Sequence, residues 1–265
     1  MKRFKDFILE SKQISRPWIF EGNFKVTEDM IYNGVLIKNK IPDEVTGDFI
    51  CYYKKLTSLE NCPTKVGGHF NCENNKLITL EGGPIEVNGD FNCCHNNLIT
   101  LKGSPSKVGR DFNCYINNLT SLYGSPAKIG RSFDCGHNKI KTLEYLPAKI
   151  GGSIQLYNNR LTSLLGCPNK INGAFNCSDN NLTSLEGFPV RVDESFYCSN
   201  NRKNLDIEIN FIWSGKYSNQ STYWLDLLKY MIDEKIDPNK IKTWPKEFLV
   251  SNIVKSIKGI SKFNL

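Results

Sequence analysis

The sequence predicts a repeat solenoid that is built mainly from β-strands, and three observations carry this prediction. From Leu56 the chain divides into seven consecutive units of 21 residues without an insertion, and a weaker eighth unit precedes them. Two apolar columns stand two residues apart in each unit, which is the period of a strand. An asparagine follows the second column by three residues in all seven full units. A regular repeat of this length indicates stacked structural units.

The first apolar column is aromatic and the second is a column of thiols. Both columns change in the same unit, where Ile154 replaces the phenylalanine and Leu156 replaces the cysteine. Because the second column accepts a leucine, we expect it to fill a dry core, as buried free cysteines usually do. The two columns are Phe49, Phe70, Phe91, Phe112, Phe133, Phe175 and Phe196, and Cys51, Cys72, Cys93, Cys114, Cys135, Cys177 and Cys198.

A metal or redox ladder is the alternative explanation of the cysteine column. Thiols in register on neighbouring parallel strands stand about 4.8 Å apart. However, no histidine or carboxylate accompanies them in a way that would complete a site. We therefore expect no metal and no cofactor.

The asparagine column predicts a sharp turn that recurs inside the stack. An asparagine amide both donates to and accepts from backbone groups that a bend leaves unpaired, which a leucine does not do. The glycine that follows the second leucine of most units permits the positive φ of another turn. The proline two residues later suits an extended return path without a helix. The asparagines are Asn75, Asn96, Asn117, Asn138, Asn159, Asn180 and Asn201.

The pattern F-x-C-x-x-N-x-L-x-x-L resembles the signature of leucine-rich repeats, with phenylalanine and cysteine in two of the leucine positions. The length of 21 residues and the segment L-T-S-L-x-x-x-P are similar to the bacterial and phage branch of that family. The resemblance covers residues 35–202. It implies a horseshoe with a parallel sheet on the concave face and short, non-helical loops on the convex face. It also implies that the concave face recognises a partner.

The repeat boundaries divide the chain into three segments. Residues 1–34 are expected to form an N-terminal helix and cap, and residues 35–202 hold eight repeats, of which the first is degenerate. Residues 203–265 are expected to form a helical C-terminal cap or a small appended domain, because apolar residues recur at helical spacing from Trp224. Repeat arrays need caps, since the last layer otherwise exposes its apolar face.

The first residues, MKRFKDFILE before Ser11, resemble the N-termini of many proteins of large tailed phages. Some of these are head proteins whose short leader is removed after a motif such as Ile8-Leu9-Glu10, which implies a cut between Glu10 and Ser11. The resemblance implies a phage-encoded protein that is head-associated or directed at the host. A simple amphipathic capping helix, with Phe4 and Ile8 on one side, is the alternative.

Composition and charge favour a cytoplasmic protein. The chain is 40% hydrophobic and 23% charged, with a formal net charge of +7. No stretch approaches the roughly 20 apolar residues of a membrane helix, and the N-terminus lacks the apolar core of a secretory signal. We expect the host cell cytoplasm if the chain is phage-encoded, with a place in the virion as the alternative. The ten cysteines are then expected to be free thiols, because disulfides are rare in a reducing cytoplasm.

The predicted binding site is a polar groove with tyrosine anchors on the concave face. Residues beside the buried phenylalanine and cysteine are expected to point out of the sheet. Tyrosine supplies contact area and hydrogen bonds at a modest entropic cost, so we expect a protein partner. Alternatively, these are solvated strand residues whose amides bond to one another. The predicted contact residues are Asn71, Asn92, Asn113, Asp134, Gln155, Asn176, Tyr197, Tyr115, Tyr157, Asp90 and Asp111.

A basic column on the loop side predicts a second possible surface, for nucleic acid or another anionic surface. A lysine or arginine follows the proline by two residues in six units, and Glu86 interrupts the column. Such a stripe suits phosphates, but it lacks interleaved aromatic residues, and it also keeps a solenoid apart from its neighbours. We therefore rank it below protein binding. The column consists of Lys65, Lys107, Lys128, Lys149, Lys170 and Arg191.

Enzymatic chemistry has little support in the sequence. The three histidines are His69, His95 and His137. The last two share one column two units apart, roughly 10 Å at sheet spacing, which is too far to share a proton or a metal. No phosphate-binding loop, nucleophile elbow or His-Glu-x-x-His motif is present. We expect a binding protein without a small-molecule substrate, a cofactor or a membrane partner.

Overall fold

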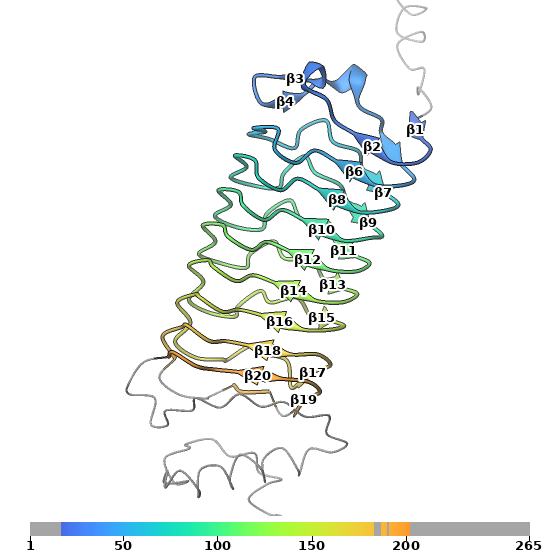
Figure 1. The fold of residues 1–265 in the computed structure, drawn as a ribbon. Coiled ribbons are helices and arrows are strands. Elements are labelled where there is room, and N and C mark those ends of the chain that lie inside the picture. The colour runs from blue at the N-terminus through green and yellow to red at the C-terminus, as the bar shows by residue number, and fades with distance from the viewer. Residues whose placement is uncertain (1–16, 183–186, 190, 202–265) are drawn as a thin grey trace, which may run out of the picture.

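The computed structural model of the chain describes residues 17–182, 187–189 and 191–201. Within these ranges the chain winds into a parallel β-solenoid of about eight turns, which lie one above another in Figure 1. Each turn corresponds to one 21-residue unit, so the predicted repeat solenoid is confirmed. The expected leader site at Glu10 and Ser11, the N-terminal helix and the helical C-terminal segment lie outside the described residues.

The phenylalanine column builds the larger sheet, which we name the Phe sheet. Its nine strands are parallel, and each pairs with strands one turn away, so that Phe91 lies beside Phe70 and Phe112. In each strand the first residue is buried and the second is partly exposed, except in β2, where the second is exposed. The strands are β2 (Phe24–Lys25), β6 (Phe49–Ile50), β8 (Phe70–Asn71), β10 (Phe91–Asn92), β12 (Phe112–Asn113), β14 (Phe133–Asp134), β16 (Ile154–Gln155), β18 (Phe175–Asn176) and β20 (Phe196–Tyr197).

The lysine column was expected on the loop side, and this prediction was wrong. The column lies in a second parallel sheet, which we name the Lys sheet. Except in β1, which is Ile19–Phe20, its strands carry a charged residue outward and a valine or isoleucine inward. The dipeptide alternates polar and apolar residues, and stacking at a fixed 21-residue interval lets its backbone pair with the turns above and below. The strands are β1 (Ile19–Phe20), β5 (Glu44–Val45), β7 (Lys65–Val66), β9 (Glu86–Val87), β11 (Lys107–Val108), β13 (Lys128–Ile129) and β15 (Lys149–Ile150).

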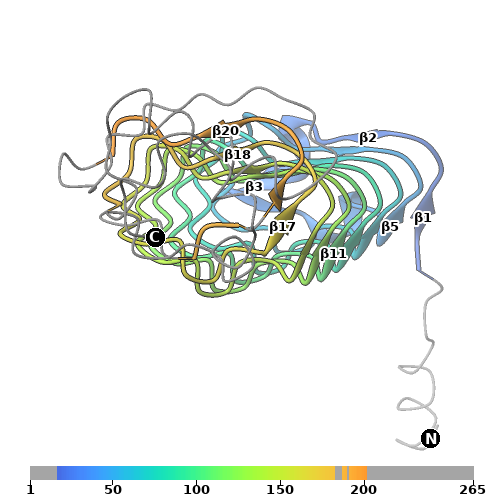
Figure 2. The same cartoon turned by 90° about the horizontal axis from the view of Figure 1, so that it is seen from below.

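Two further strands, β17 (Lys170–Ile171) and β19 (Arg191–Val192), pair with each other in parallel and carry the same residue pattern. In each turn only three residues separate the lysine dipeptide from the phenylalanine dipeptide. The two sheets therefore adjoin one rounded edge of the coil, as the view along the stack shows (Figure 2).

Residues near the N-terminal end of the stack add short irregular elements. Strands β3 (Ile31–Tyr32) and β4 (Val35–Leu36) form an antiparallel pair. The helical segments among the described residues are two single 3₁₀ turns, η1 (Glu28–Met30) and η2 (Lys38–Lys40). Neither is long and apolar enough to cross a membrane.

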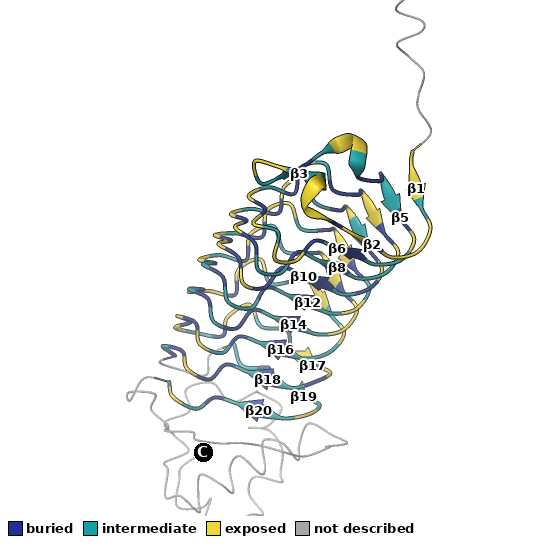
Figure 3. Ribbon diagram, turned by 45° about the horizontal axis from the view of Figure 1, so that its top comes forward, coloured by how far each residue is buried: buried dark blue, intermediate teal, exposed yellow. Residues whose placement is uncertain are grey.

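The core is a continuous column of phenylalanine, cysteine and leucine side chains inside the coil. Buried residues recur at the same places in turn after turn along the stack, as the colouring of Figure 3 shows. The rings of Phe70, Phe91 and Phe112 stack with centroids 5.1 Å apart and planes within 11° of parallel. The cysteine column is buried next to them, with Cys72, Cys93 and the others at 3% exposure or less. The predicted role of these thiols as core residues is confirmed.

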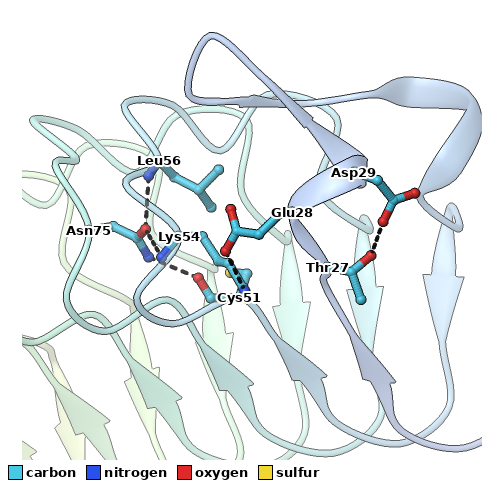
Figure 4. A network of polar contacts seen from close by, with 7 residues as sticks. All are labelled: Thr27, Glu28, Asp29, Cys51, Lys54, Leu56 and Asn75. Atoms are coloured by element: carbon cyan, nitrogen blue, oxygen red, sulfur yellow. Dashed lines mark hydrogen bonds and ion pairs between the residues drawn. The ribbon is translucent and has the colours of Figure 1, made fainter.

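The asparagine column forms a buried ladder, as the sequence predicted. Figure 4 shows the first rung, where Asn75 Oδ1 accepts the N–H groups of Leu56 at 2.8 Å and Lys54 at 3.0 Å. Asn75 Nδ2 donates to the carbonyl oxygens of Cys51 and Cys72, both at 2.9 Å. Each asparagine thus joins its own turn to the preceding one. The same arrangement recurs at Asn96, Asn117, Asn138, Asn159, Asn180 and Asn201.

Candidate partner-binding surface

The structure brings the predicted contact column together on the outer side of the Phe sheet. Neighbouring members pair in register from one strand to the next, and each is partly exposed. The column is Asn71, Asn92, Asn113, Asp134, Gln155, Asn176 and Tyr197. This is the sheet that the resemblance to leucine-rich repeats assigns to recognition.

Most side-chain oxygens of this column already accept a hydrogen bond from the backbone of their own turn. Asn71 Oδ1 accepts the N–H of Glu73 at 3.0 Å, and Asn113 Oδ1 accepts that of Tyr115 at 2.9 Å. The equivalent bond within the same turn recurs at Asn92, Asp134 and Asn176. Each of these side chains thus forms an Asx turn, which stabilises the bend where the chain leaves the strand. Among the described residues no hydrogen bond joins two members of this column across turns, which was one alternative from the sequence. The amide N–H groups of Asn71, Asn113 and Asn176 also make no hydrogen bond within that part of the chain, and all three residues are partly exposed.

Asp90 and Asp111 belong to a second ladder at the start of the Phe-sheet strands. Asp90 Oδ1 accepts the N–H of Asp111 at 3.0 Å, and Asp111 Oδ1 accepts the N–H of Ser132 at 2.8 Å. His69 Nδ1 lies 2.8 Å from the other oxygen of Asp90. Each carboxylate thus ties its turn to the next one, so the groups are structural as well as partly exposed.

Tyr115 and Tyr157 come together in a cluster that also contains two histidines. The Tyr115 ring lies 5.9 Å from the ring of His95 and 5.0 Å from that of His137, both edge to face. The Tyr157 ring lies 5.4 Å from His137 and 6.0 Å from Tyr115. We name these four residues the Tyr–His cluster. Edge-to-face pairs of this kind hold side chains in one arrangement at the surface.

Gly136 makes this cluster possible. It occupies the turn between the two tyrosines, in the same column. A Cβ atom at Gly136 would stand 2.7 Å from ring atoms of Tyr157. The glycine therefore opens the space into which the Tyr157 ring folds toward the ring of Tyr115.

The electrostatics keep the Tyr157 hydroxyl protonated. Burial raises the pKa of Tyr157 to about 12, and the neighbouring Asp134 carboxylate and the Tyr115 side chain add to the shift. Burial also raises the pKa of Asp134, against a hydrogen bond from the Gly136 N–H and the charge of His137. A tyrosine is protonated at neutral pH even at its ordinary pKa of 10.0, and the shift extends this protonated form to higher pH, beside the partly buried Asp134 carboxyl group.

Sequence reasoning missed the two histidines and Gly136 as parts of this surface. It placed His95 and His137 in one column two turns apart and considered only a direct contact between them. The structure inserts the Tyr115 ring, from the neighbouring column, between the two imidazoles. The available signal was the Tyr-Gly-Tyr order in one column, since a lone glycine between bulky residues provides room for one of them.

The thiols of the solenoid offer little chemistry. All ten cysteines are free. Burial raises the pKa of Cys72, Cys93 and Cys114 well above the ordinary value, and it raises the pKa of Cys94 and of Cys167 to about 12. Since the thiolate is the nucleophile and the metal ligand, these groups are unreactive in the folded chain.

Comparisons with known protein families, curated proteins and solved structures find no match. The likeness to leucine-rich repeats therefore rests on the residues of the repeat. What the structure establishes is a β-solenoid with a period of about 21 residues and a buried asparagine ladder.

Proposed function

We propose that this chain is a non-enzymatic binding module that holds a protein partner against the outer side of the Phe sheet, centred on the Tyr–His cluster. The observation that carries the proposal is the packed, partly exposed arrangement of Tyr115, His137 and Tyr157. In the other turns this position holds Tyr52, Glu73, Cys94, Gly136, Ser178 or Ser199, so two tyrosines only two turns apart occur at this place alone among the described turns. The cluster is thus a local feature of an otherwise regular face.

The physical properties of the cluster suit recognition of a protein. Tyrosine offers a large amphipathic surface and loses little side-chain freedom on binding. The rings are already held by contacts with one another, so binding orders few additional groups. The protonated Tyr157 hydroxyl and the outward N–H groups of Asn113 and Asn176 supply hydrogen-bond donors around the rings. Exposed aromatic residues at the centre of an interface commonly carry most of its binding energy.

A double substitution tests this proposal. Tyr115→Ser with Tyr157→Ser removes both rings and keeps a hydroxyl at each position. The matched control is Tyr123→Ser with Tyr145→Ser, which removes another pair of contacting tyrosines, 5.5 Å apart and about half exposed. Proteins captured from a cell lysate by the wild-type chain would be identified by mass spectrometry, and the affinity of the purified partner measured by calorimetry.

We expect the cluster variant to bind the partner at least 100-fold more weakly, because two central aromatic side chains at about 2 kcal/mol each are lost. The control variant should bind within about threefold of wild type. Equal losses in both variants, or none in the cluster variant with its circular dichroism unchanged, would show that the partner uses a different surface.

A head-associated role is a narrower form of the same proposal, and only the N-terminal resemblance supports it. If the chain is packaged with its leader removed, mass spectrometry of purified particles should find a peptide that begins at Ser11. Particles that lack this protein altogether would exclude that role and leave the binding module untouched.

A further inference from the structure

The outward charges of the Lys sheet alternate in its first turns and are compensated there. Glu44, Lys65, Glu86 and Lys107 follow one another in register. Lys65 Nζ lies 3.3 Å from Glu44, and Lys107 Nζ lies 3.6 Å from Glu86. At the other end, Lys170 and Arg191 both contact Asp193. Carboxylates therefore contact the basic residues at both ends of the column, one for each lysine at the first end and one for two cations at the second.

The middle of the column is different. Lys107, Lys128 and Lys149 lie on neighbouring strands in direct register, about 4.8 Å apart. Within the described part of the chain, Lys128 and Lys149 form no ion pair. Like charges on adjacent strands are destabilising, and the first turns show that this fold accommodates an alternating pattern. Lys128 and Lys149 therefore reduce the stability of the fold, whereas an acidic residue at either position would have formed ion pairs and increased it.

Two arginines extend this positive region around the edge of the coil. Arg110 and Arg131 lie in the bend between the Lys sheet and the Phe sheet, one turn apart, and the Arg131 N–H donates to the Arg110 carbonyl oxygen at 3.0 Å. Both are exposed, and neither has an ion-pair partner among the described residues. The corresponding position is Gly68, Gly89 or Gly152 in nearby turns. We name Lys128, Lys149, Arg110 and Arg131 the cationic patch.

Small residues flank the lysines of the patch. The residues before the lysines are Ala127 and Ala148, and the residues two positions after them are Gly130 and Gly151, whose backbone N–H groups are already bonded within the sheet. The carboxylate closest in sequence to Arg110 is that of Asp111, whose Oδ1 accepts a hydrogen bond from the Ser132 N–H. Within the described units of the 21-residue repeat, the exposed large apolar residue of these columns is Ile85, which lies two turns before Ala127.

We propose that the cationic patch binds the phosphate backbone of nucleic acid without reading its sequence. Two guanidinium groups and two ammonium groups, spaced one turn apart, offer contacts to about three or four phosphates. Arginine binds phosphate through paired N–H groups, and lysine acts as a point charge. The alanines and glycines beside the lysines leave room for a nucleic-acid backbone, and they carry no side-chain groups that could read base edges. The lysines of the patch lie on the Lys sheet and its arginines in the bend beside that sheet, whereas the Tyr–His cluster follows the strands of the Phe sheet. The patch therefore provides a second surface.

The test is the salt dependence of binding to a labelled DNA duplex of about 20 base pairs and mixed sequence, measured by fluorescence anisotropy between 50 and 200 mM salt. Four phosphate contacts predict a slope of about −3 to −4 in a plot of log affinity against log salt. Lys128→Gln with Lys149→Gln, and Arg110→Gln with Arg131→Gln, should each reduce the magnitude of that slope by about 2. Each should weaken binding at 50 mM salt about 100-fold.

The matched control is Lys65→Gln with Lys107→Gln. It removes the same charge from the same column at positions where carboxylates already pair with the lysines. We expect this variant to keep the slope within about 0.5 of wild type. A control that loses as much affinity as the patch variants would overturn the proposal, because the net charge of +7 would then be responsible for the binding.

Two other results would also overturn it. The first is the absence of measurable duplex binding at 50 mM salt. The second is patch-dependent binding to heparin or to vesicles with anionic phospholipid but not to the duplex, which would assign the patch to a sulfated polysaccharide or a lipid surface. Neither result bears on the protein-binding surface, which is tested with different variants.

Discussion

Asn96 shows how a single side chain closes a turn inside a dry stack. Its Oδ1 accepts the N–H of Leu77 at 3.0 Å, and its Nδ2 donates to the carbonyl oxygens of Cys72 and Cys93. The side chain is 6% exposed, so water does not replace these bonds. Of the uncharged side chains, only a carboxamide combines an acceptor and two donors in this space, which explains why the column holds asparagine in every full unit.

Replacement of Asn96 by leucine should therefore strongly destabilise the solenoid. The Leu77 N–H would lose its acceptor while it remains buried, and the bonds to both carbonyl groups would also be lost. We expect a loss of about 3–5 kcal/mol in the free energy of unfolding, measured by urea titration.

Asn97→Leu is the matched control for this substitution. The side chain of Asn97 is exposed, and the described hydrogen bond of this residue uses its backbone N–H. This variant should change stability by less than about 0.5 kcal/mol. Similar losses in both variants would mean that the ladder contributes no more than an ordinary surface residue.

At the scale of the element, strand β16 departs from the pattern of its neighbours. It carries Ile154 where the other turns of the repeat carry phenylalanine, and Leu156 follows in place of cysteine. Both are buried, at 1% and 0% exposure. The aromatic stack is interrupted here, and the ring of Phe133, next to the gap, is tilted by 34° from that of Phe112. A smaller residue in the first position is combined with a larger one in the second, so the total volume is nearly kept.

This compensation predicts strong coupling between the two positions. Ile154→Phe alone should overpack the turn, and Leu156→Cys alone should leave a cavity, each at a cost of about 1–3 kcal/mol. The double variant restores the pattern of the other turns and should be within about 1 kcal/mol of wild type. A double-mutant cycle from urea unfolding measures the coupling. Additive losses would show that the two side chains fill independent spaces.

At the scale of the whole molecule, the thiols with raised pKa values, in the cysteine column and at Cys94 and Cys167, make stability dependent on pH. Burial raises the pKa of several cysteines above the ordinary value of 9.0, to about 12 for Cys94 and Cys167. In the unfolded chain the same thiols lose their protons near pH 9. Between these values the folded state binds more protons than the unfolded state, so the free energy of unfolding decreases as the pH rises.

We therefore expect stability to be nearly constant from pH 7 to 8.5 and to fall steeply above pH 9, by up to about 1.4 kcal/mol per pH unit for each buried thiol. Urea unfolding at pH 7, 9 and 10 measures this slope. The series is repeated at 0.5 M salt, which screens the exposed lysines and leaves the buried thiols unaffected. A slope that disappears at high salt, or native thiols that react rapidly with a thiol reagent at pH 8, would contradict the buried column.

Much of the fold was predictable because its determinants repeat at one fixed interval. The phenylalanine, cysteine and asparagine columns are visible in the sequence, and their burial follows from the strand period and from stacking. The candidate site was less predictable. The sequence placed Tyr115 and Tyr157 on the outer side of a strand. Their contact, however, depends on the turn between them, which contributes Gly136 from the same column and His137 from the neighbouring column.

The sequence by itself determined the repeat, the identity of the core columns and the need for an asparagine at each buried turn. These properties depend on spacing along the chain and on the hydrogen-bonding capacity of single residues. Only the tertiary structure decided that the lysine column forms a second sheet and that two tyrosines and two histidines meet. It also decided that, among the described residues, no carboxylate pairs with Lys128 or Lys149 as Glu44 and Glu86 pair with Lys65 and Lys107. These properties arise between neighbouring turns, where the direction of each side chain determines its contacts.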